Sequence, residues 1–350
     1  MIKSLKLTNW RNYSSYKTDF DRYNVILGPN ASGKTNILES IYFCSNLTSW
    51  RSVNDQDLVK WNRDYFEINL NIVNQNNDLL RVFVEPREIG AVKRIEINKT
   101  RKTRKTLNEM IKTVLFSPEQ IDSLFTPGGR RQYLNHFLSQ KDYHYGYALR
   151  QYSKVVRAKN IILEKISENL CSRQELDFWN QKLVESAEIL TNFRRDWFKF
   201  INAKIKPSYR LISGTNEKIY LEFYLKTPPE KLMEKIIENT NKEISAGITL
   251  YGPHRDDWGI NLKGYDLIKT GSRGEWRSAL IGIKVLEAQY LSSEELKPVM
   301  LLDDFLSELD DSRKANFFNE IKEYQVILTS AESSNLKIIG DKWNVVTTNG

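Results

Sequence analysis

The chain has few cysteines, few histidines and no long apolar segment. Its two cysteines, Cys44 and Cys171, do not form a CxxC pair, so neither structural zinc nor a disulfide framework is expected. No run of about 18 apolar residues occurs, so no membrane-spanning helix is expected. The N-terminal segment alternates apolar and polar residues and lacks the apolar core of a signal peptide. These absences indicate a reduced, cytoplasmic protein.

The composition is that of a globular protein, with 40% hydrophobic, 27% charged and 11% aromatic residues among 350. Such a chain is long enough for one large domain or two ordinary ones. The formal net charge of +8 favours polyanionic partners, either nucleic acid or anionic lipid. A soluble protein with surplus surface lysine would give the same count.

A glycine-rich loop, GPNASGKT at residues 28–35, matches the pattern G-x-x-x-x-G-K-S/T at every fixed position. Its glycines let the backbone curl so that successive N–H groups point at phosphate. Lys34 would reach the β- and γ-phosphates of ATP, and the Thr35 hydroxyl would bind Mg²⁺. Segment 23–27 predicts a strand before the loop, and apolar residues at helical spacing from Ile37 predict a helix after it. This context favours a phosphate-binding site.

A second part of the site is predicted near the other end of the chain. Val299–Leu302 is a continuous apolar run, typical of a strand buried on both faces of a parallel sheet. Asp303, which follows it, is expected to hold Mg²⁺ beside the glycine loop, and Asp304 to polarise the attacking water as general base. Alternatively, these aspartates only begin a turn. A helix at 311–324 and a strand at 325–330 would complete a βαβ unit.

A second glycine loop contains Ser272, Gly274 and Glu275, just before a segment with helical apolar spacing. By itself, this pattern is typical of a loop that caps a helix. The order of glycine loop, signature loop, double-acid strand and D-loop resembles the ABC-type ATPases. The resemblance implies that the signature loop of one subunit completes the nucleotide site of another. Residues 307–310, ending at Asp310, look like the D-loop.

The resemblance narrows to the RecF family through four stretches: LTNWRNY, LGPNASGKTNILESIY, TLYGPHRDDW and LLDDFLSELDDSR. A fifth stretch, VLFSPEQIDSLFTPGGRRQYLNHFLSQ, resembles the family's passage into its helical lobe. The composition of residues 120–210 predicts helices. This insertion is too short for the coiled coils of SMC proteins and has no CxxC hook.

The expected fold is α/β: an ABC-type P-loop ATPase head with a mixed or parallel sheet, plus an inserted, mainly helical lobe. The head is expected at residues 1–118 and 247–350, and the lobe at 119–246. The family resemblance implies ATP-dependent DNA binding in recombinational repair. ATP would drive head-to-tail dimerisation, slow hydrolysis would release the dimer, and recombinase loading would be the outcome.

The resemblance also implies a role for each matching residue. The expected ATP-binding residues are Gly28, Pro29, Asn30, Ala31, Ser32, Gly33, Lys34, Thr35, Asn36, Arg11, Asn12, Arg51, Ser272, Gly274, Glu275 and Asp310. Lys34, Asp303 and Asp304 are expected to be catalytic, and Thr35 and Asp303 to bind Mg²⁺. Arg51 could equally be a solvated arginine after a helix.

Two loops depart from the usual family pattern. Ala31 and Ser32 stand where Gly-Gln is usual in the phosphate loop. The signature loop reads SRGEWR where SQGQQR is common, so Glu275 can accept hydrogen bonds but cannot donate them as glutamine does. The hydrogen bonds of the signature loop are therefore expected to differ from those of the usual family pattern.

Two further positions leave alternatives open. Either Glu119 or Gln120 would serve as the Q-loop residue of this chain. No histidine follows the strand at 325–330, so Thr329 or Ser330 would occupy the switch position. A slow ATPase is expected from these replacements.

Basic residues gather at 93–112 and again in the helical insertion, where they would neutralise DNA phosphates without reading base sequence. Segment 97–103 is expected to form a hairpin tip. The expected DNA-binding residues are Lys93, Arg94, Lys99, Arg101, Lys102, Arg104, Lys105, Arg130 and Arg131. Any one cluster could be an ordinary solvated face. Duplex DNA or a single-strand/duplex junction is the favoured partner. The resemblance adds an ATP-bound homodimer, a RecR-like mediator and a RecA-type recombinase.

Two alternative functions share parts of this pattern. A P-loop kinase, or another self-contained nucleotide-dependent enzyme that does not act on DNA, would have no use for the signature loop. A nuclease attached to an ABC-type ATPase would need an acidic metal-binding domain, for which the chain has no spare length. The cluster His254–Asp257 is interpreted as an internal salt-bridge network rather than a metal site.

Overall fold

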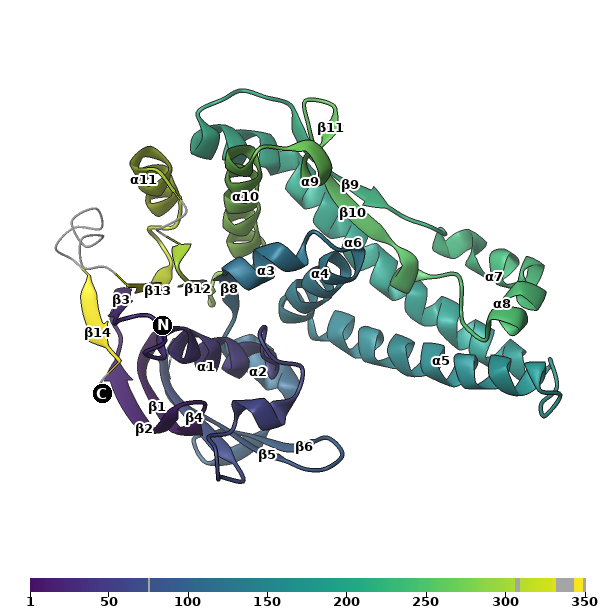
Figure 1. Ribbon diagram of the computed structural model, residues 1–350, viewed down its shortest axis with the longest axis horizontal. Helices are drawn as coiled ribbons and strands as arrows, with labels where there is room; N and C mark the ends of the chain where they lie inside the picture. Colours follow the sequence, from purple (N-terminus) through teal and green to yellow (C-terminus); the bar gives the residue numbers. More distant parts are fainter. Residues whose placement is uncertain (75, 306–308, 332–342, 349–350) are drawn as a thin grey trace. The chain divides into compact units, whose positions relative to one another are not determined.

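The computed structural model describes residues 1–74, 76–305, 309–331 and 343–348. The chain divides into two compact units (Figure 1). The first unit comprises Met1–Ser123, Leu211–Ser213 and Ser278–Gly350, and the second comprises Leu124–Arg210 and Gly214–Arg277. Within the described ranges, no helix has both the length and the apolarity that crossing a bilayer requires.

The first unit contains a parallel sheet of five strands in the order β14-β3-β13-β12-β8. These strands are β3 (Tyr23–Leu27), β8 (Thr113–Phe116), β12 (Val299–Leu302), β13 (Gln325–Ser330) and β14 (Asn344–Thr347). Every residue of β8, β12 and β13 is buried, as expected for strands covered on both faces. The strands predicted at 23–27, 299–302 and 325–330 are confirmed.

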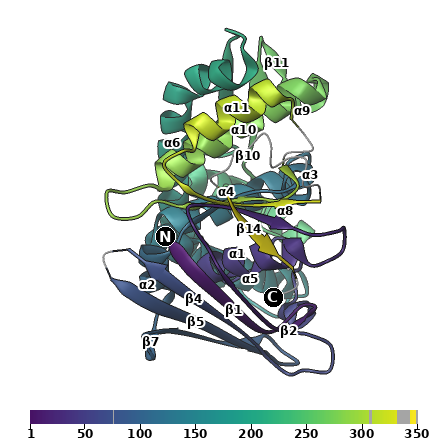
Figure 2. The ribbon, with the colours of Figure 1, turned by 90° about the vertical axis from the view of Figure 1, so that its left-hand side faces the viewer.

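A six-stranded antiparallel sheet forms the rest of the first unit's β-structure, in the order β2-β1-β4-β5-β6-β7 (Figure 2). Its strands are β1 (Ile2–Trp10), β2 (Tyr13–Asp19), β4 (Phe66–Val73), β5 (Asn77–Pro86), β6 (Ala91–Ile97) and β7 (Thr100–Lys102). In β4, buried and half-buried residues alternate strictly up to the last position, so only one face meets the core. The sequence patterns predicted the first strand and the β6–β7 hairpin, but not this sheet as a whole.

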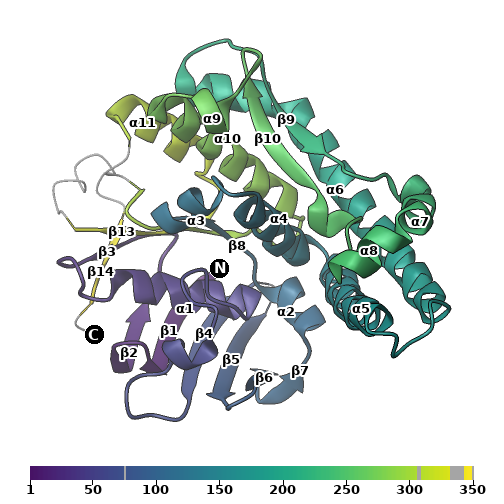
Figure 3. The same cartoon turned by 45° about the vertical axis from the view of Figure 1, so that its right-hand side comes forward.

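Helix α1 (Lys34–Asn46) lies between the two sheets (Figure 3). All of its residues from Ile37 onward are buried, since one side of the helix packs on β13 and β8 and another on β1. The remaining helices of this unit are the short turn η1 (Asp55–Leu58), α2 (Arg104–Met110), α3 (Pro118–Ser123) and α11 (Asp311–Glu320). Helix α10 (Arg273–Leu291) begins in the second unit and continues into the first. The predicted helix at 311–324 therefore forms, but it ends four residues earlier.

The second unit is mainly helical, as predicted for residues 120–210. Its helices are α4 (Pro127–Lys141), α5 (Tyr143–Ser167), α6 (Glu175–Ser213), α7 (Pro229–Glu238), α8 (Thr240–Ala246) and α9 (Leu267–Thr270). A three-stranded sheet in the order β11-β10-β9 joins them, with the turn η2 (Pro253–Arg255) leading into it. Its strands are β9 (Ile219–Tyr224), β10 (Asp257–Leu262) and β11 (Tyr265–Asp266).

The observed units divide the chain differently from the predicted lobes. The expected boundary lies between residues 246 and 247, whereas the second unit continues to Arg277. The reason is strand pairing, since β10 runs antiparallel to β9 over six residue pairs, from Asp257 opposite Tyr224 to Leu262 opposite Ile219. A sequence pattern that places β10 after the helical insertion does not reveal which strand it pairs with.

Candidate nucleotide-binding site

A cavity of about 470 Å³ lies at the carboxyl edge of the parallel sheet in the first unit. Parallel strands end at the same edge, so loops that are far apart in sequence meet there. The cavity collects predicted residues from four segments: Asn12, Asn30, Ala31, Gly33, Lys34, Thr35, Asn36, Arg51, Asp303 and Asp304. Glu119 and Thr329, each proposed as one of two alternatives, also line it.

The glycine loop between β3 and α1 has a backbone that most side chains would disturb. Gly33 has φ of 101°, in the left-handed region that glycine tolerates best. A Cβ atom at this position would lie 2.6 Å from the Tyr13 hydroxyl and 2.7 Å from Asn12 Nδ2. Ala31 also has positive φ, 64°, without being glycine. The N-terminus of α1 has no side-chain cap, and the N–H groups of Lys34 and Thr35 precede the first bond to the Gly33 carbonyl, which Asn36 donates, so these two groups can donate to an anion.

The ammonium of Lys34 is held by the loop itself. Its Nζ donates to the carbonyl oxygens of Gly28 at 2.6 Å and Pro29 at 2.8 Å. Burial lowers the pKa of Lys34, and the nearby carboxylates of Asp304 and Asp303 act in the opposite direction. The lysine is therefore ordered inside the cavity, where a polyphosphate could replace the carbonyl oxygens as its acceptor.

Two hydroxyl side chains, from two different segments, converge on one carboxylate oxygen of Asp303. Thr35 Oγ1 donates to Asp303 Oδ1 at 3.0 Å, and Thr329 Oγ1 donates to the same oxygen at 2.7 Å. The Thr329 hydroxyl also accepts from the backbone N–H of Asp304 at 3.0 Å. Asp304 is exposed and has φ of 48°, which turns the chain sharply after β12. Thr329 of β13 thus contacts both residues of the acidic pair.

Asp303 has the properties of a cation ligand. It is 5% exposed, and burial raises the pKa of its carboxyl group despite the hydrogen bonds from Thr329 and Thr35. In the described part of the chain it has no ion pair with a basic side chain. Thr35 and Asp303 offer hard oxygen donors beside the phosphate loop, the donor type that Mg²⁺ prefers. The residues present therefore fit Mg²⁺, with Thr35 and Asp303 as the protein ligands.

Arg11, predicted as an ATP-binding residue that lies close to the nucleotide, is not among the residues that line the cavity. Its guanidinium binds the buried carboxylate of Glu39, with Nε to Oε2 at 2.8 Å, and it also donates to the Asp57 carbonyl at 2.9 Å. The pair with Glu39 holds the guanidinium in place, and the role of Arg11 in nucleotide binding stays a prediction. Sequence reasoning missed Glu39; the signal was an acid among the apolar residues of NILESIYF.

Arg51 and Asn12 are linked through Asn36, in the first turn of α1. Arg51 donates to Asn36 Oδ1 at 2.9 Å, and Asn36 Nδ2 donates to Asn12 Oδ1 at 2.8 Å. Arg51 also lies 3.8 Å from the carboxylate of Glu39 and 3.9 Å from that of Glu119. Its side chain is 35% exposed, so Arg51 brings a positive charge to the cavity rather than extending into bulk solvent.

The two candidates for the Q-loop residue point to different partners. Glu119, half exposed, lines the cavity. Gln120 instead accepts a hydrogen bond from the buried ammonium of Lys284 on α10, at 2.7 Å. Lys284 in turn pairs with Glu287 one turn later, at 3.1 Å. Short helix α3 therefore presents one of these side chains to the cavity and the other to α10.

The signature loop forms a capping box at the start of α10. Ser272 Oγ donates to Glu275 Oε2 at 2.9 Å, and the backbone N–H of Ser272 donates to the same oxygen at 3.0 Å. Glu275 also accepts from Tyr265 and Lys263, and the contacts with Ser272 are the largest cause that lowers its pKa to about 2. Gly274 lies in the first turn of α10.

The predicted D-loop is only partly within the described residues. Asp310 caps α11 and accepts from the backbone N–H of Arg313 at 2.9 Å. Leu309 is buried. Ser307 and Glu308 lie outside the described residues.

The predicted hairpin in the basic segment is present. Asn98 and Lys99 both have positive φ, 50° and 65°, as the two central residues of a two-residue hairpin turn require, and Ile97 pairs with Thr100 across it. Exposed cations on or beside this hairpin are Arg94, Lys99, Arg101, Lys102 and Lys105. They lie on one short stretch of the first unit with side chains in solvent.

Four of the predicted DNA-binding residues are held by the protein instead. Arg130 is 8% exposed and forms a bidentate pair with Asp257, at 2.8 and 2.6 Å, so its prediction as a phosphate contact is wrong. Lys93 pairs with Asp55 at 2.8 Å, and Arg104 donates to the Asn46 carbonyl at 2.9 Å. Arg131 lines a separate cavity in the second unit. Burial removes Arg130 from the basic surface, whereas Lys93, Arg104 and Arg131 are half-buried and their role in DNA binding stays a prediction.

The cluster His254–Asp257 is an internal network, as interpreted from sequence. Asp256 pairs with the buried Arg194 at 3.1 Å, and Asp257 pairs with Arg130. His254 Nδ1 lies 2.6 Å from the Tyr152 hydroxyl, and burial lowers the pKa of His254 to about 4. Among the described residues, no group of three or more acidic, histidine or cysteine side chains is arranged to hold a metal ion.

A family model, a relative of known name and a solved structure all match this chain over nearly its whole length. The family model RecF/RecN/SMC N terminal domain matches residues 1–349. The DNA replication and repair protein RecF of Thermoanaerobacter sp. (strain X514) is 33% identical over 347 residues, which cover 96% of this chain and 95% of the relative. A solved structure of the recombination mediator protein RecF-ATP in the RecFOR pathway is 29% identical, with a TM-score of 0.88 over 99% of this chain and 95% of that chain.

A more distant match concerns the fold alone. The structure of an SMC head bound to the C-winged helix domain of ScpA is 16% identical, with a TM-score of 0.55 over 98% of this chain and 93% of that chain. The two sheets around α1 and the inserted helices therefore belong to the ABC-type ATPase architecture that the sequence predicted.

Proposed function

Since the chain belongs to the RecF family, we propose that it is an ATP-binding and ATP-hydrolysing protein of DNA replication and repair. The single observation that carries this proposal is the convergence of Thr35, Thr329 and Asp303 beside Lys34. Hydrogen-bond donors for phosphate, a cationic side chain and hard oxygen ligands for Mg²⁺ then surround one cavity. Bound Mg²⁺ would neutralise charge on the transferring phosphoryl group.

Each residue has a proposed task in this site. Lys34 exchanges its two carbonyl acceptors for phosphate oxygens, and the first-turn N–H groups of α1 donate to the same phosphates. Asp304 accepts a proton from the attacking water, while Thr329 holds the backbone of Asp304 in place through its N–H. A hydroxyl at this position orients the acid but is a poor proton acceptor, which fits slow hydrolysis.

We further propose that ATP acts by joining two copies of the chain head to tail. The signature loop with Ser272, Gly274 and Glu275 would contact the γ-phosphate bound to the other copy, and Asp310 would lie at the crossing between the two sites. A nucleotide that binds the closed dimer and not the open monomer shifts the population to the dimer by mass action. Hydrolysis removes the γ-phosphate and so releases the dimer.

The DNA contact proposed here uses the exposed basic hairpin. Arg94, Lys99, Arg101, Lys102 and Lys105 would bind phosphates of duplex DNA or of a single-strand/duplex junction, without base readout. A RecR-like mediator and a RecA-type recombinase are the proposed partners, with recombinase loading as the outcome. These partners follow from family membership alone.

The test is the solution mass of the protein with Mg²⁺ and ATP, measured by light scattering. We expect ATP to double the mass of the wild type and Ser272→Arg to prevent the doubling. Asp304→Asn should lengthen the time for which the dimer persists, because it slows hydrolysis. Ser167→Arg is the matched control, because Ser167 is an exposed serine at the end of α5, outside every predicted site. This variant should dimerise as the wild type does.

A wild type that remains monomeric with ATP saturating its site would sink the dimer proposal. A self-contained P-loop enzyme, such as a kinase, would then be the better description. Loss of ATP binding in Lys34→Ala, measured by calorimetry, separates this outcome from a failure of the nucleotide site itself.

A further inference from the structure

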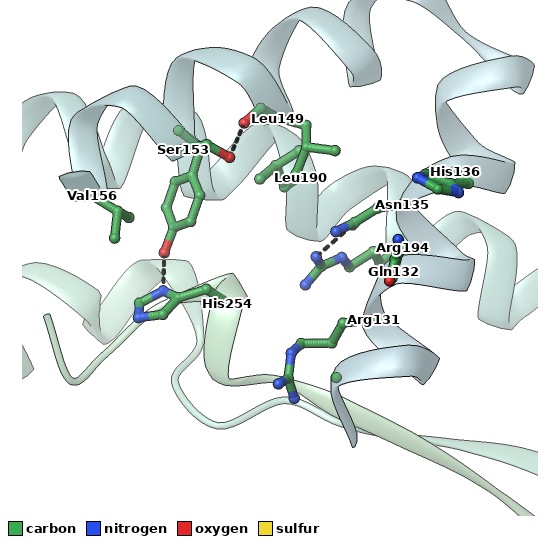
Figure 4. Close-up of a pocket in the computed structure, with 12 residues that line it drawn as sticks. Arg131, Gln132, Asn135, His136, Leu149, Ser153, Val156, Leu190, Arg194 and His254 are labelled. Atoms are coloured by element: carbon green, nitrogen blue, oxygen red, sulfur yellow. Dashed lines mark hydrogen bonds between the residues drawn. The ribbon is translucent and has the colours of Figure 1, made fainter. Parts of the chain in front are cut away.

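The second unit contains a cavity of about 460 Å³ that no step of the proposed function uses. Helices α4, α5 and α6 and the turn η2 supply its lining (Figure 4). Cavities of a few hundred Å³ are the size of small-ligand pockets. Figure 4 shows Leu149 and Leu190 on one side of the cavity and Arg131 and His254 on the other.

The cavity has a surplus of positive charge. None of its twelve lining residues is acidic, whereas two are arginines, Arg131 and Arg194. The carboxylate of Asp256 accepts from Arg194 and from the backbone N–H of Lys226, at 3.1 Å in both cases. The carboxylate of Asp257 is occupied by Arg130 and by the backbone N–H of Trp258. The two aspartates thus form close ion pairs with Arg130 and Arg194, whereas Arg131 acts on both carboxylates only at longer range.

Arg131 differs from Arg130 and Arg194 in having no carboxylate within ion-pair distance among the described residues. One guanidinium nitrogen donates to the backbone carbonyl of Asp256 at 3.2 Å, and among the described residues it makes no ion pair with an acid. His254 adds no charge, because its Nε2 donates to the Thr249 carbonyl and its Nδ1 accepts from Tyr152, as the neutral ring does. The desolvation that lowers the pKa of His254 is reinforced by nearby cations, Arg131 among them.

A neutral donor lies beside this charge. The amide oxygen of Asn135 accepts from the Tyr145 hydroxyl at 2.6 Å and from Arg194 at 3.0 Å. Both partners are donors, so the amide orientation is determined and Nδ2 is left to donate to a ligand. Gln132, exposed at the rim, adds a flexible amide.

The opposite wall is apolar. Leu149, Val156 and Leu190 line it, and the ring of Tyr152 extends it toward His254. A free inorganic anion would leave this wall in contact with water, and a neutral apolar molecule would leave the charge of Arg131 without a partner. Only a ligand with both parts satisfies both sides of the cavity.

We propose that this cavity binds a small amphipathic anion, in which a phosphate or carboxylate group at Arg131 and Asn135 is joined to an apolar or aromatic body packed against Leu149, Val156 and Leu190. The proposal is independent of the nucleotide site, since no residue of the glycine loop or of the acidic pair lines this cavity. It also assigns Arg131 to a ligand of the second unit rather than to DNA.

The experiment is calorimetric titration of the full chain, with its nucleotide site filled by Mg²⁺ and a non-hydrolysable ATP analogue. The probes are phenyl phosphate and benzoate, with inorganic phosphate as the anion without a body and benzyl alcohol as the body without a charge. We expect at least one of the first two probes to bind, and both half-probes to bind at least tenfold more weakly. Whichever of phenyl phosphate and benzoate binds with the higher affinity shows whether the cavity prefers a phosphate or a carboxylate group.

Two variants and one control locate the binding. Arg131→Gln should weaken the probe at least tenfold, and Leu149→Trp, which fills the apolar side, should abolish binding. Arg157→Gln removes an exposed arginine of α5 that does not line the cavity, and it should change affinity less than twofold. Unchanged melting temperatures without probe show that the variants are folded, and the Leu149 variant tests the site even if Arg131→Gln is destabilised.

Three results would overturn the proposal. The first is no binding of either probe, or binding that neither cavity variant weakens. The second is equal affinity for benzyl alcohol or for inorganic phosphate, which would mean that the two halves of the cavity do not act together. The third is displacement of the probe by duplex DNA in the wild type with a matching loss of DNA affinity in Arg131→Gln, which would return this arginine to the DNA surface.

Discussion

The backbone at Gly33 combines positive φ with close neighbours, whereas Gly90 has positive φ of 79° and no atom within 4 Å of the place where a Cβ would stand. Both Gly→Ala changes strain the backbone by about 1–2 kcal/mol. Only Gly33→Ala also forces a methyl group against the Tyr13 hydroxyl. We expect Gly33→Ala to abolish ATP binding and to lower the free energy of unfolding by more than Gly90→Ala, in urea titrations. Equal losses in the two variants would show that the contact with Tyr13 does not matter.

Without a bound cation, the buried carboxylate of Asp303 lowers the free energy of unfolding of the protein. Burial raises the pKa of its carboxyl group, so the folded state binds this proton more tightly than the unfolded state, where the pKa is near 3.8. The stabilisation that protonated Asp303 gives the folded state is therefore fully present below pH 3.8. It is lost as the pH rises through the folded-state pKa, when the buried group becomes charged. Asp303→Asn keeps the shape and removes the charge. We expect the variant to be about 1 kcal/mol more stable than the wild type at pH 7 without Mg²⁺.

The pH dependence identifies the cause of this gain. The difference in unfolding free energy should shrink as pH falls and vanish below 3.8, where aspartate is neutral in both states. Asp310→Asn is the control, because Asp310 is half exposed and caps a helix. A variant of Asp303 that is less stable than the wild type at pH 7 would contradict a desolvation cost at this residue.

At the scale of elements, α10 carries an ion pair in its buried middle. Lys284 and Glu287 are each 3% exposed, and burial lowers the pKa of the lysine and raises that of the glutamate. In the described chain, Glu287 Oε1 has no hydrogen-bond partner. We expect Lys284→Met alone to cost about 3 kcal/mol of unfolding free energy, because Glu287 then lacks its cation.

The double variant Lys284→Met with Glu287→Met should recover most of that loss, since it removes both buried charges. A denaturation cycle over the wild type, the two single variants and the double variant measures the coupling. Additive losses would mean that the two groups do not stabilise each other and that the hydrogen bond from Lys284 to Gln120 carries the effect instead.

At the scale of the whole molecule, the charge of +8 is useful for DNA only where it remains exposed. Replacing Lys99, Arg101 and Lys102 by glutamine should reduce the slope of log affinity against log salt by about one unit for each DNA phosphate that is no longer neutralised. The measurement is fluorescence anisotropy of a labelled duplex at several salt concentrations. A triple change of the exposed Lys231, Lys235 and Lys242 in the second unit is matched in charge and should leave the slope unchanged. Equal effects of the two triples would mean that net charge, not the hairpin, binds DNA.

The sequence by itself determined the local elements of this protein. The spacing of glycines, lysine and apolar residues predicted a strand at 23–27, a loop at 28–35 and a helix after it, and the apolar run before Asp303 predicted β12. Both predictions hold, because backbone conformation and periodicity act over a few residues. The positive-φ turn at Asn98 and Lys99 was readable for the same reason.

Tertiary structure alone decided which of these residues meet. Thr329 contacts Asp303 because β12 and β13 are neighbours in the sheet, and Arg11 is turned onto Glu39 by a contact across 28 positions of the chain. Arg130 and Arg131 are adjacent in sequence, yet one is buried on Asp257 and the other lines a cavity. Burial, strand pairing and the choice of which arginine pairs with which carboxylate depend on residues far apart in sequence. No local sequence pattern therefore contains them.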